Sequence, residues 1–565
     1  MKKLILLIVL IGTIGLGDLY ASNDRVIVST TLDFLDIAMQ SKCPEGYLTL
    51  EAYEALIKRL ADAGITRINL RTNVIGVVFH NSKYTIKYGE NGAWHYYNQA
   101  WSKRLIETLK HYDPLAETIR LGHKYGMEVW CWENITDEGG LSKYDPATVP
   151  ANAQKDNKLT GGYPLVDPFF RTHPSCWATT KPFDYAEVAS KNFKAQQYPI
   201  AKIVITSYRT DRPPIKFKKS DIDLYYSYDN KSYMKYEKDF EFIAERINGH
   251  NQLTLKGLSI HAPYIKMAPK TVYDSTRLYT FAVKGHYDSG KAYNTKGKEV
   301  PIYWGHNDPR GVKLPANFQY NTSIFFHSMP SIAIDHGQRQ IGFYVGEVVG
   351  ENHLVGVVEF CDPVALQHKL NKFSELAAYD FDGFRMSMNC HSDADNPDRF
   401  SYHPALRERL LKKTGKDIWA DELPLKRIVE ERAEGFVDYI KGCKKLIGDR
   451  PLYIYGWRPG DKEFFISHGR TNMGTLNWPY KRMIQENIID GICMYEDFSN
   501  YFTPEITGGK DLHLSLYRCL ESGRRSKVME LDKVTQNKAL DEVEYYGTIE
   551  LSQQIWQMIK NYTGK

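Results

Sequence analysis

Cysteine is sparse and unpatterned in this chain of 565 residues. None of its eight cysteines forms a C-x-x-C pair, and this absence excludes the usual zinc and c-type haem signatures. An excess of charge of one sign is also lacking. The 73 Lys and Arg residues against 68 Asp and Glu residues give a formal charge of +5, which is too small over this length to indicate a nucleic-acid-binding protein. We therefore expect no metal centre and no nucleic-acid partner.

Several catalytic motifs are missing as well. The sequence contains no G-x-S-x-G elbow, no Walker loop, no H-E-x-x-H pair and no G-x-G-x-x-G after its first predicted strand. These absences disfavour serine hydrolases, nucleotide hydrolases, zinc proteases and Rossmann oxidoreductases. We expect no cofactor.

Long apolar runs are absent except at the N-terminus. Lys2 and Lys3 precede an apolar stretch over residues 4–16, and small or polar residues follow through Ala21 and Ser22. This order is typical of a secretory signal peptide, and the run is too short to span a bilayer comfortably. We predict cleavage after Ala21 and export of the mature protein, without a membrane span, to the periplasm or the cell exterior.

The composition is that of a folded protein. Hydrophobic residues make up 42% and charged residues 25% of the chain, with a mean hydropathy of −0.45, so a sizeable core is available and intrinsic disorder is excluded. The length fits two to four domains, or one large barrel with additions. The 39 Tyr and 10 Trp residues suit sugar faces, although Tyr-rich cores and sheets are the commoner explanation.

Two stretches of the chain alternate strand-like and helix-like segments. The predicted strands cover residues 26–31, 67–70, 127–132, 384–389, 452–457 and 491–496, with further strands between 512 and 551. The predicted helices cover residues 48–63, 113–123, 363–379, 425–447 and 479–487, and a short strand at 357–360 leads into the third of them. This repeating order predicts an α/β fold, specifically a (β/α)8 TIM barrel.

The segment between these stretches is different. Short β-rich runs such as 203–206, 222–227 and 278–283 are separated by turn clusters, which indicates an antiparallel β-sandwich. Residues 223–236 resemble the strand–turn–strand of carbohydrate-binding jelly-roll modules. The predicted organisation is a signal peptide at 1–21, the first part of the barrel at 22–182, an inserted sandwich at 183–340 and the second part of the barrel at 341–565.

Three passages resemble the secreted family-10-like glycosyl hydrolase barrels of bacteria. They are DPLAETIRLGHKYGMEVWCWEN (113–134), FCDPVALQHKLNKFSELAAYDFDGFRMSMN (360–389) and residues 402–452. With the chain around them they cover roughly half of the mature protein, and they imply a barrel that acts on glycosidic bonds. The sequence departs from the family where an acidic residue is usual, because Ser387 stands at that position, and the inserted sandwich is also additional.

Barrel enzymes carry their active groups after the carboxyl ends of the strands, and glycoside cleavage needs two carboxyl groups. Glu133 follows a Trp-Cys-Trp strand end, where aromatic walls would raise a carboxyl pKa and suit a proton donor. Glu496 ends the sixth predicted strand, and alternation would send only one of Glu496 and Asp497 into the barrel mouth. An ion-paired loop acid is the alternative reading of Glu133, and a helix cap or ion pair is that of Glu496.

The polar loop after the fourth predicted strand offers further groups. Asp393 is a candidate second carboxyl, and His391 is a candidate for binding sugar hydroxyls. His391, Asp393 and Asp395 together also permit a weaker metal-site hypothesis. Three later acids, Glu521, Glu530 and Glu550, remain alternatives for a late-strand nucleophile.

The remaining strand ends supply predicted substrate-binding residues. Arg385 lies inside a predicted strand and must be paired, either with a neighbouring strand-end acid or with an acidic substrate. For the others, rim packing is the alternative: they are Arg71, Asn73, Trp132, Trp457, Arg458 and Tyr495.

The leading hypothesis is therefore an exported glycoside hydrolase that cleaves a polysaccharide or oligosaccharide with a pair of carboxyl groups, Glu133 and Glu496 first among them. Ser387 motivates the alternative of a carbohydrate-binding barrel without activity. A metal-dependent hydrolase is the third hypothesis.

Overall fold

The computed structural model describes residues 26–40, 43–74, 76–90, 100–136, 138, 167–179, 181, 194, 197–207, 218–228, 232, 234–269, 288–300, 343–345, 353–387, 401–459, 478–519, 537–546 and 553–564. Eight parallel strands form a closed barrel. In order around it they are β1 (Ile27–Leu32), β2 (Arg67–Arg71), β5 (Glu128–Asn134), β17 (Gly383–Ser387), β18 (Leu452–Gly456), β19 (Gly491–Met494), β20 (His513–Cys519) and β21 (Glu542–Tyr546). Pairing of β1 with both β2 and β21 closes the ring, which confirms the predicted α/β barrel.

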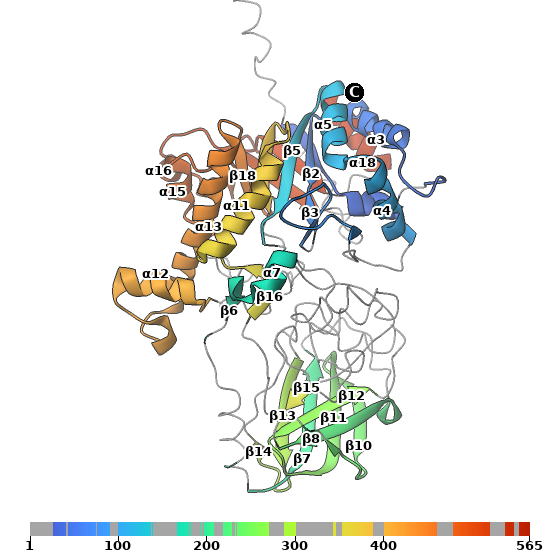
Figure 1. The fold of residues 1–565 in the computed structure, drawn as a ribbon, viewed down its shortest axis with the longest axis vertical. Coiled ribbons are helices and arrows are strands. Elements are labelled where there is room, and N and C mark those ends of the chain that lie inside the picture. Colours follow the sequence, from blue (N-terminus) through green and yellow to red (C-terminus); the bar gives the residue numbers. More distant parts are fainter. Residues whose placement is uncertain are drawn as a thin grey trace, which may run out of the picture.

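Helices surround this barrel (Figure 1). Asp113 and Asp362 each precede a helix that begins with proline, and each side chain accepts hydrogen bonds from amides of the first turn, so the sequence sets these two starts locally. Within the described residues the α-helices are α2 (Phe34–Gln40), α3 (Leu50–Asp62), α4 (Ala100–His111), α5 (Pro114–Lys124), α7 (Pro168–Thr172), α11 (Pro363–Ala377), α12 (Pro404–Thr414), α13 (Leu425–Ile447), α15 (Tyr480–Gln485), α16 (Pro504–Thr507) and α18 (Gln553–Thr563).

Alternation along the barrel strands separates an apolar outer face from a polar and aromatic interior. Val129 and Ile454 belong to the large apolar cluster that includes residues of the helices. Their strand neighbours Trp130 and Tyr453 belong to a second, aromatic cluster inside the barrel. Because side chains alternate along a strand, this division assigns every strand position to one face or the other.

The chain leaves the barrel after β5 and returns to it at β17. Between these strands its described residues form two larger antiparallel sheets, which Figure 1 shows apart from the barrel, and one two-stranded sheet. One apolar cluster contains side chains of both sheets, among them Ile203, Leu224, Leu255 and Ile265. The five-stranded sheet has the order β10 (Glu241–Ile247), β11 (His250–Ile260), β7 (Ile200–Ser207), β13 (Asp288–Asn294) and β14 (Glu299–Val300). The four-stranded sheet has the order β15 (Phe343–Val345), β12 (Tyr264–Pro269), β8 (Ile222–Ser227) and β9 (Met234–Lys235).

Some boundaries differ from those expected. The four-stranded sheet includes β15, so it extends beyond residue 340, where the sequence analysis placed the end of the insertion. The strand expected at 357–360 forms as β16 (His353–Val358), but it pairs antiparallel with β6 (Trp177–Thr179) outside the barrel. A second small hairpin joins β3 (Asn73–Val74) and β4 (Val77–Val78). The run at 278–283 lies outside the described residues.

Among the described residues, no helix combines the length and apolar character needed to cross a membrane. Cys131 and Cys493 are buried free thiols, as expected for cysteines within apolar strands.

Candidate functional site at the barrel mouth

Aromatic side chains line the barrel interior at the carboxyl ends of the strands. Trp132, Tyr455 and Tyr517 belong to the interior cluster, and Tyr495 and Tyr546 pack against it. The Trp132 and Tyr455 rings meet edge to face at 6.0 Å, and the Trp457 ring is stacked on that of Tyr495 at 4.9 Å. We call these aromatic residues the mouth cluster: Trp132, Tyr455, Trp457, Tyr495, Tyr517 and Tyr546.

Burial divides the mouth cluster into two levels. Trp132 and Tyr455 are 2% and 0% exposed, whereas Trp457 and Tyr495 are half-buried. The first two therefore lie within the barrel, and the last two contact both the interior and the rim.

Asp33 and Arg71 form an ion pair beside this cluster. Asp33 follows β1 and accepts a hydrogen bond from the Leu35 amide at the start of α2. The Arg71 Nη1 atom lies 2.6 Å from Asp33 Oδ2, and the Tyr546 hydroxyl donates to the same oxygen at 3.1 Å. Burial and the neighbouring Asp33 charge raise the pKa of Tyr546 well above its usual value, so this phenol stays a neutral donor.

A chain of buried charges fills the barrel below the mouth. Arg385 Nη1 lies 2.6 Å from Glu544 and Nη2 lies 2.5 Å from Glu542, which also pairs with Arg67. Burial alone would raise the pKa of Glu542, but Arg385 and Arg67 hold it well below its usual range. Arg385 therefore lies inside the barrel and is paired with strand acids. We call this set the barrel charge ladder: Arg67, Arg385, Glu542 and Glu544.

Glu544 links the ladder to the mouth cluster. The Tyr455 hydroxyl donates to both of its carboxylate oxygens, at 2.6 and 2.7 Å, and the Thr31 hydroxyl donates at 2.5 Å. Burial, with the Glu544 charge second, raises the pKa of Tyr455 well above its usual value. With Arg385 included, both oxygens of Glu544 are occupied by protein donors.

Glu133 does not lie in the mouth, where the sequence analysis placed it. Because Trp132 faces the interior, its neighbour Glu133 faces the outer helices. Lys369 Nζ of α11 lies 3.1 Å from Glu133 Oε1, and the Tyr439 hydroxyl of α13 donates to Oε2 at 3.1 Å. Glu133 is thus a buried, ion-paired acid between the barrel and its helices.

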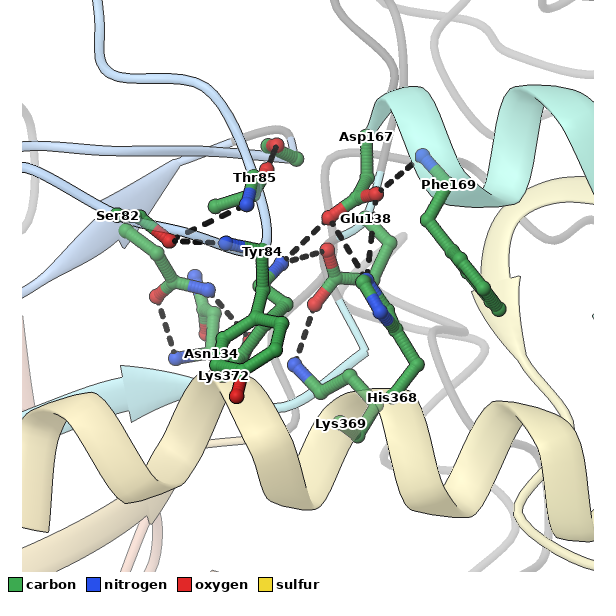
Figure 2. Close-up of polar contacts among 12 residues, drawn as sticks. Ser82, Tyr84, Thr85, Asn134, Glu138, Asp167, Phe169, His368, Lys369 and Lys372 are labelled. Carbon is green, nitrogen blue, oxygen red and sulfur yellow. Dashed lines mark hydrogen bonds and ion pairs between the residues drawn. The ribbon is translucent and has the colours of Figure 1, made fainter.

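This pair belongs to a larger buried set on α11, which Figure 2 shows in part. Lys369 also pairs with Glu138, and Lys372 lies 2.5 Å from Glu138 Oε2 and 2.8 Å from Asp167 Oδ2. His368 Nε2 lies 3.4 Å from Asp167 Oδ1, and its ring is stacked on Phe169 at 3.8 Å. We call the six titratable residues the α11 charge network: Glu133, Glu138, Asp167, His368, Lys369 and Lys372.

The charges of the α11 network stabilise one another. Burial opposes ionisation, but Lys372 lowers the pKa of Asp167, and Glu133 with Glu138 raises the pKa of Lys369. Because Glu138 and Asp167 follow β5 and α11 precedes β17, the network links the segment through which the chain leaves the barrel to the helix through which it returns.

Other predicted site residues lie at the rim of the barrel, in the segments that follow β18 and β19. Glu496 and Arg458 have exposed side chains at the rim. Asp497 has the same strand parity as Tyr495 and accepts hydrogen bonds from Ser499 and Asn537.

Asn73, a predicted substrate-binding residue, instead holds the end of β5. Its amide donates to the Asn134 carbonyl and its oxygen accepts from the Asn134 amide, both at 2.8 Å. Six predicted acids or ligands lie outside the described residues: His391, Asp393, Asp395, Glu521, Glu530 and Glu550.

Several residues of the site were not identified from the sequence. Asp33, Tyr455, Tyr517, Glu544 and Tyr546 all point into the barrel. The alternating run Glu-Val-Glu-Tyr-Tyr at 542–546 carries the signal for β21, since charged and apolar residues alternate along it. At the end of β17, Ser387 shares the interior parity of Arg385 and is fully buried.

No group of three or more His, Cys, Asp or Glu side chains within the described ranges has the geometry to hold a metal ion.

Comparisons with known proteins leave the family open. No family model matches the chain, and no curated protein matches it. Among solved structures, the chain is similar to the one titled "Crystal structure of TcOYE with pHBA", an old yellow enzyme with a TIM barrel. The two are 8% identical, the match covers 95% of this chain and 88% of the other, and the TM-score is 0.32. A likeness this weak identifies neither a family nor an activity.

Proposed function

We propose that this protein is an exported glycoside hydrolase that binds its sugar in the barrel mouth. The observation that carries the proposal is the mouth cluster, which joins aromatic rings from several strands to the carboxylate of Asp33. Ligand sites are typically apolar and aromatic surfaces with a few placed polar groups, and barrel enzymes build them at this end. The resemblance to secreted family-10-like glycosyl hydrolases and the N-terminal signal sequence agree with it.

Residues at the barrel mouth can be assigned separate roles in sugar binding and bond cleavage. Trp457 offers a half-buried ring at the rim for the apolar face of a sugar. Asp33, ion-paired with Arg71, is suited to act as a nucleophile or base. Glu496 and Asp497 are the exposed acids that follow β19, and we propose one of them as the proton donor. Asp393 remains the alternative second carboxyl. Glu133 has no place in this scheme, because it faces the outer helices.

We also propose that the two inserted sheets form a sandwich similar to carbohydrate-binding modules. Their shared apolar cluster and the resemblance of residues 223–236 to such modules support this proposal.

A release assay tests the hydrolase. The mature protein from Ser22 onward is incubated with plant, algal and host polysaccharides and oligosaccharides, and products are read by mass. We expect turnover that falls at least about 100-fold in Asp33→Asn and in one of the two variants Glu496→Gln and Asp497→Asn, the typical contribution of one acid or base. Glu505→Gln is the control, since Glu505 is an exposed acid on α16. Unchanged turnover in folded Asp33→Asn, or in both Glu496→Gln and Asp497→Asn, contradicts the assignment.

Ser387 favours a second candidate, a carbohydrate-binding barrel without activity. It occupies an interior position at a strand end, where the resembling family usually has an acid. In this case the mature protein binds a glycan from the panel, releases no product, and binds equally well after Glu496→Gln.

A further inference from the structure

Trp132 has an unusual position within the mouth cluster. It is 2% exposed on the interior face of β5, yet its indole Nε1 has no hydrogen-bond acceptor among the described residues. A buried donor without a partner costs about 1–3 kcal/mol, so an acceptor supplied at this point would be stabilising.

The Trp132 ring is packed against two neighbours. The Arg71 guanidinium lies over one face of the ring, 5.3 Å from its centroid, and the Trp132 and Tyr455 rings meet edge to face. A sugar therefore cannot stack on the face that Arg71 covers. What the residue still offers is the N–H at its edge.

The backbone around Trp132 is fixed. The Thr72 amide donates to the Trp132 carbonyl at 3.1 Å, and the Ile135 amide donates to the Ser387 carbonyl at 2.9 Å. Asn73 holds the next residue, Asn134, through two hydrogen bonds. The indole is thus held in one place, as a specific contact requires.

The buried arginines on the interior side of the mouth are already paired with acids of the protein. Arg71 is paired with Asp33, and Arg385 is paired with Glu542 and Glu544. The acceptor that suits an indole N–H in these surroundings is a neutral oxygen, such as a hydroxyl group, rather than a carboxylate or sulfate.

We propose that the Trp132 indole N–H donates a hydrogen bond to one hydroxyl group of a neutral sugar ring and so reads that position. The inference rests on the proposed function, because it needs a sugar in the mouth. Trp132 then determines which sugar is bound, whereas Trp457 stacks on the apolar face of the sugar ring.

The test compares Trp132→Phe with the unchanged protein by calorimetric titration of a neutral oligosaccharide that the mature protein binds. We expect affinity to fall about 2- to 13-fold, the net effect of losing one hydrogen bond. Monodeoxy analogues of the sugar are then titrated. For one of them, the variant and the unchanged protein bind equally, because the acceptor and the donor belong to the same bond.

Trp556→Phe is the matched control. Trp556 on α18 also has an Nε1 without an acceptor among the described residues, but it packs under Arg59 on the outer helices. Its substitution leaves affinity unchanged. If Trp132→Phe fails to fold, benzothienylalanine at position 132 keeps the ring shape and removes only the N–H.

The outcomes separate the inference from the function on which it rests. Equal affinity for the parent sugar in both proteins overturns the inference alone, and so does the same loss for every deoxy analogue. If the unchanged protein binds no sugar of the panel, the proposed function fails and the inference fails with it.

Discussion

Two neighbouring residues at the end of β5 have opposite environments. Trp132 faces the barrel interior, and Glu133 faces α11 and α13. The sequence showed a carboxyl beside tryptophans, but strand alternation places these groups on opposite sides of the sheet. Glu133 and Trp132 are neighbours in sequence but lie on opposite faces of the sheet. The acids inside the barrel, Glu542 and Glu544, come from another strand, β21.

The position of Glu133 leads to a prediction about stability. Glu133→Gln removes one of the two carboxylates that face the buried Lys369, and we expect the free energy of unfolding to fall by about 1–3 kcal/mol. Chemical denaturation measures this loss. Any turnover is retained in the folded variant, since Glu133 does not face the mouth. Lost turnover without lost stability would show that Glu133 takes part in the chemistry.

At the scale of elements, helix α11 carries the cationic half of the charge network. Lys369 and Lys372 both lie on the face of α11 that meets Glu138 and Asp167, the two acids that follow β5. Burying ions is costly unless they are paired, so these partners are expected to act as a unit. The helix itself was predicted from its apolar spacing, but its partners come from distant parts of the chain and carry no local signal.

This network predicts acid sensitivity. The pKa of Asp167 is lowered in the folded state, so its stabilising contribution is present above its unfolded pKa, about 3.9, and is lost as the pH falls below it. We expect stability to decline from about pH 5 downward, with most of the loss below about pH 4. Asp167→Asn lowers stability at pH 7 and shows a smaller decline over that interval, because this carboxyl no longer takes up a proton.

Thermal unfolding across this pH range checks the acid prediction. Asp62→Asn is its control, because Asp62 forms only an exposed pair with Lys58 and should follow the profile of the unchanged protein. An Asp167→Asn protein with an unchanged acid slope contradicts this account of the network.

At the scale of the whole molecule, the barrel could be predicted because each βα unit repeats a local pattern. Six of its strands were predicted because strand-like segments alternate with helix-like segments along the chain. The last two, β20 and β21, were poorly defined because their interior residues include His513, Glu542 and Glu544, which break the apolar run. The candidate site was predicted in part, since the predicted residues Arg71, Trp132, Trp457 and Tyr495 come together at the mouth. Asp33 was not predicted, because its contact with Tyr546 forms only when β1 pairs with β21.

The most direct test of sugar binding in the barrel mouth is a crystal structure of the mature protein with a bound oligosaccharide from the release or binding panel. We expect a sugar ring in the mouth, against Trp457 and within reach of Asp33. A sugar bound only to the inserted sheets, with none in the mouth, would contradict it.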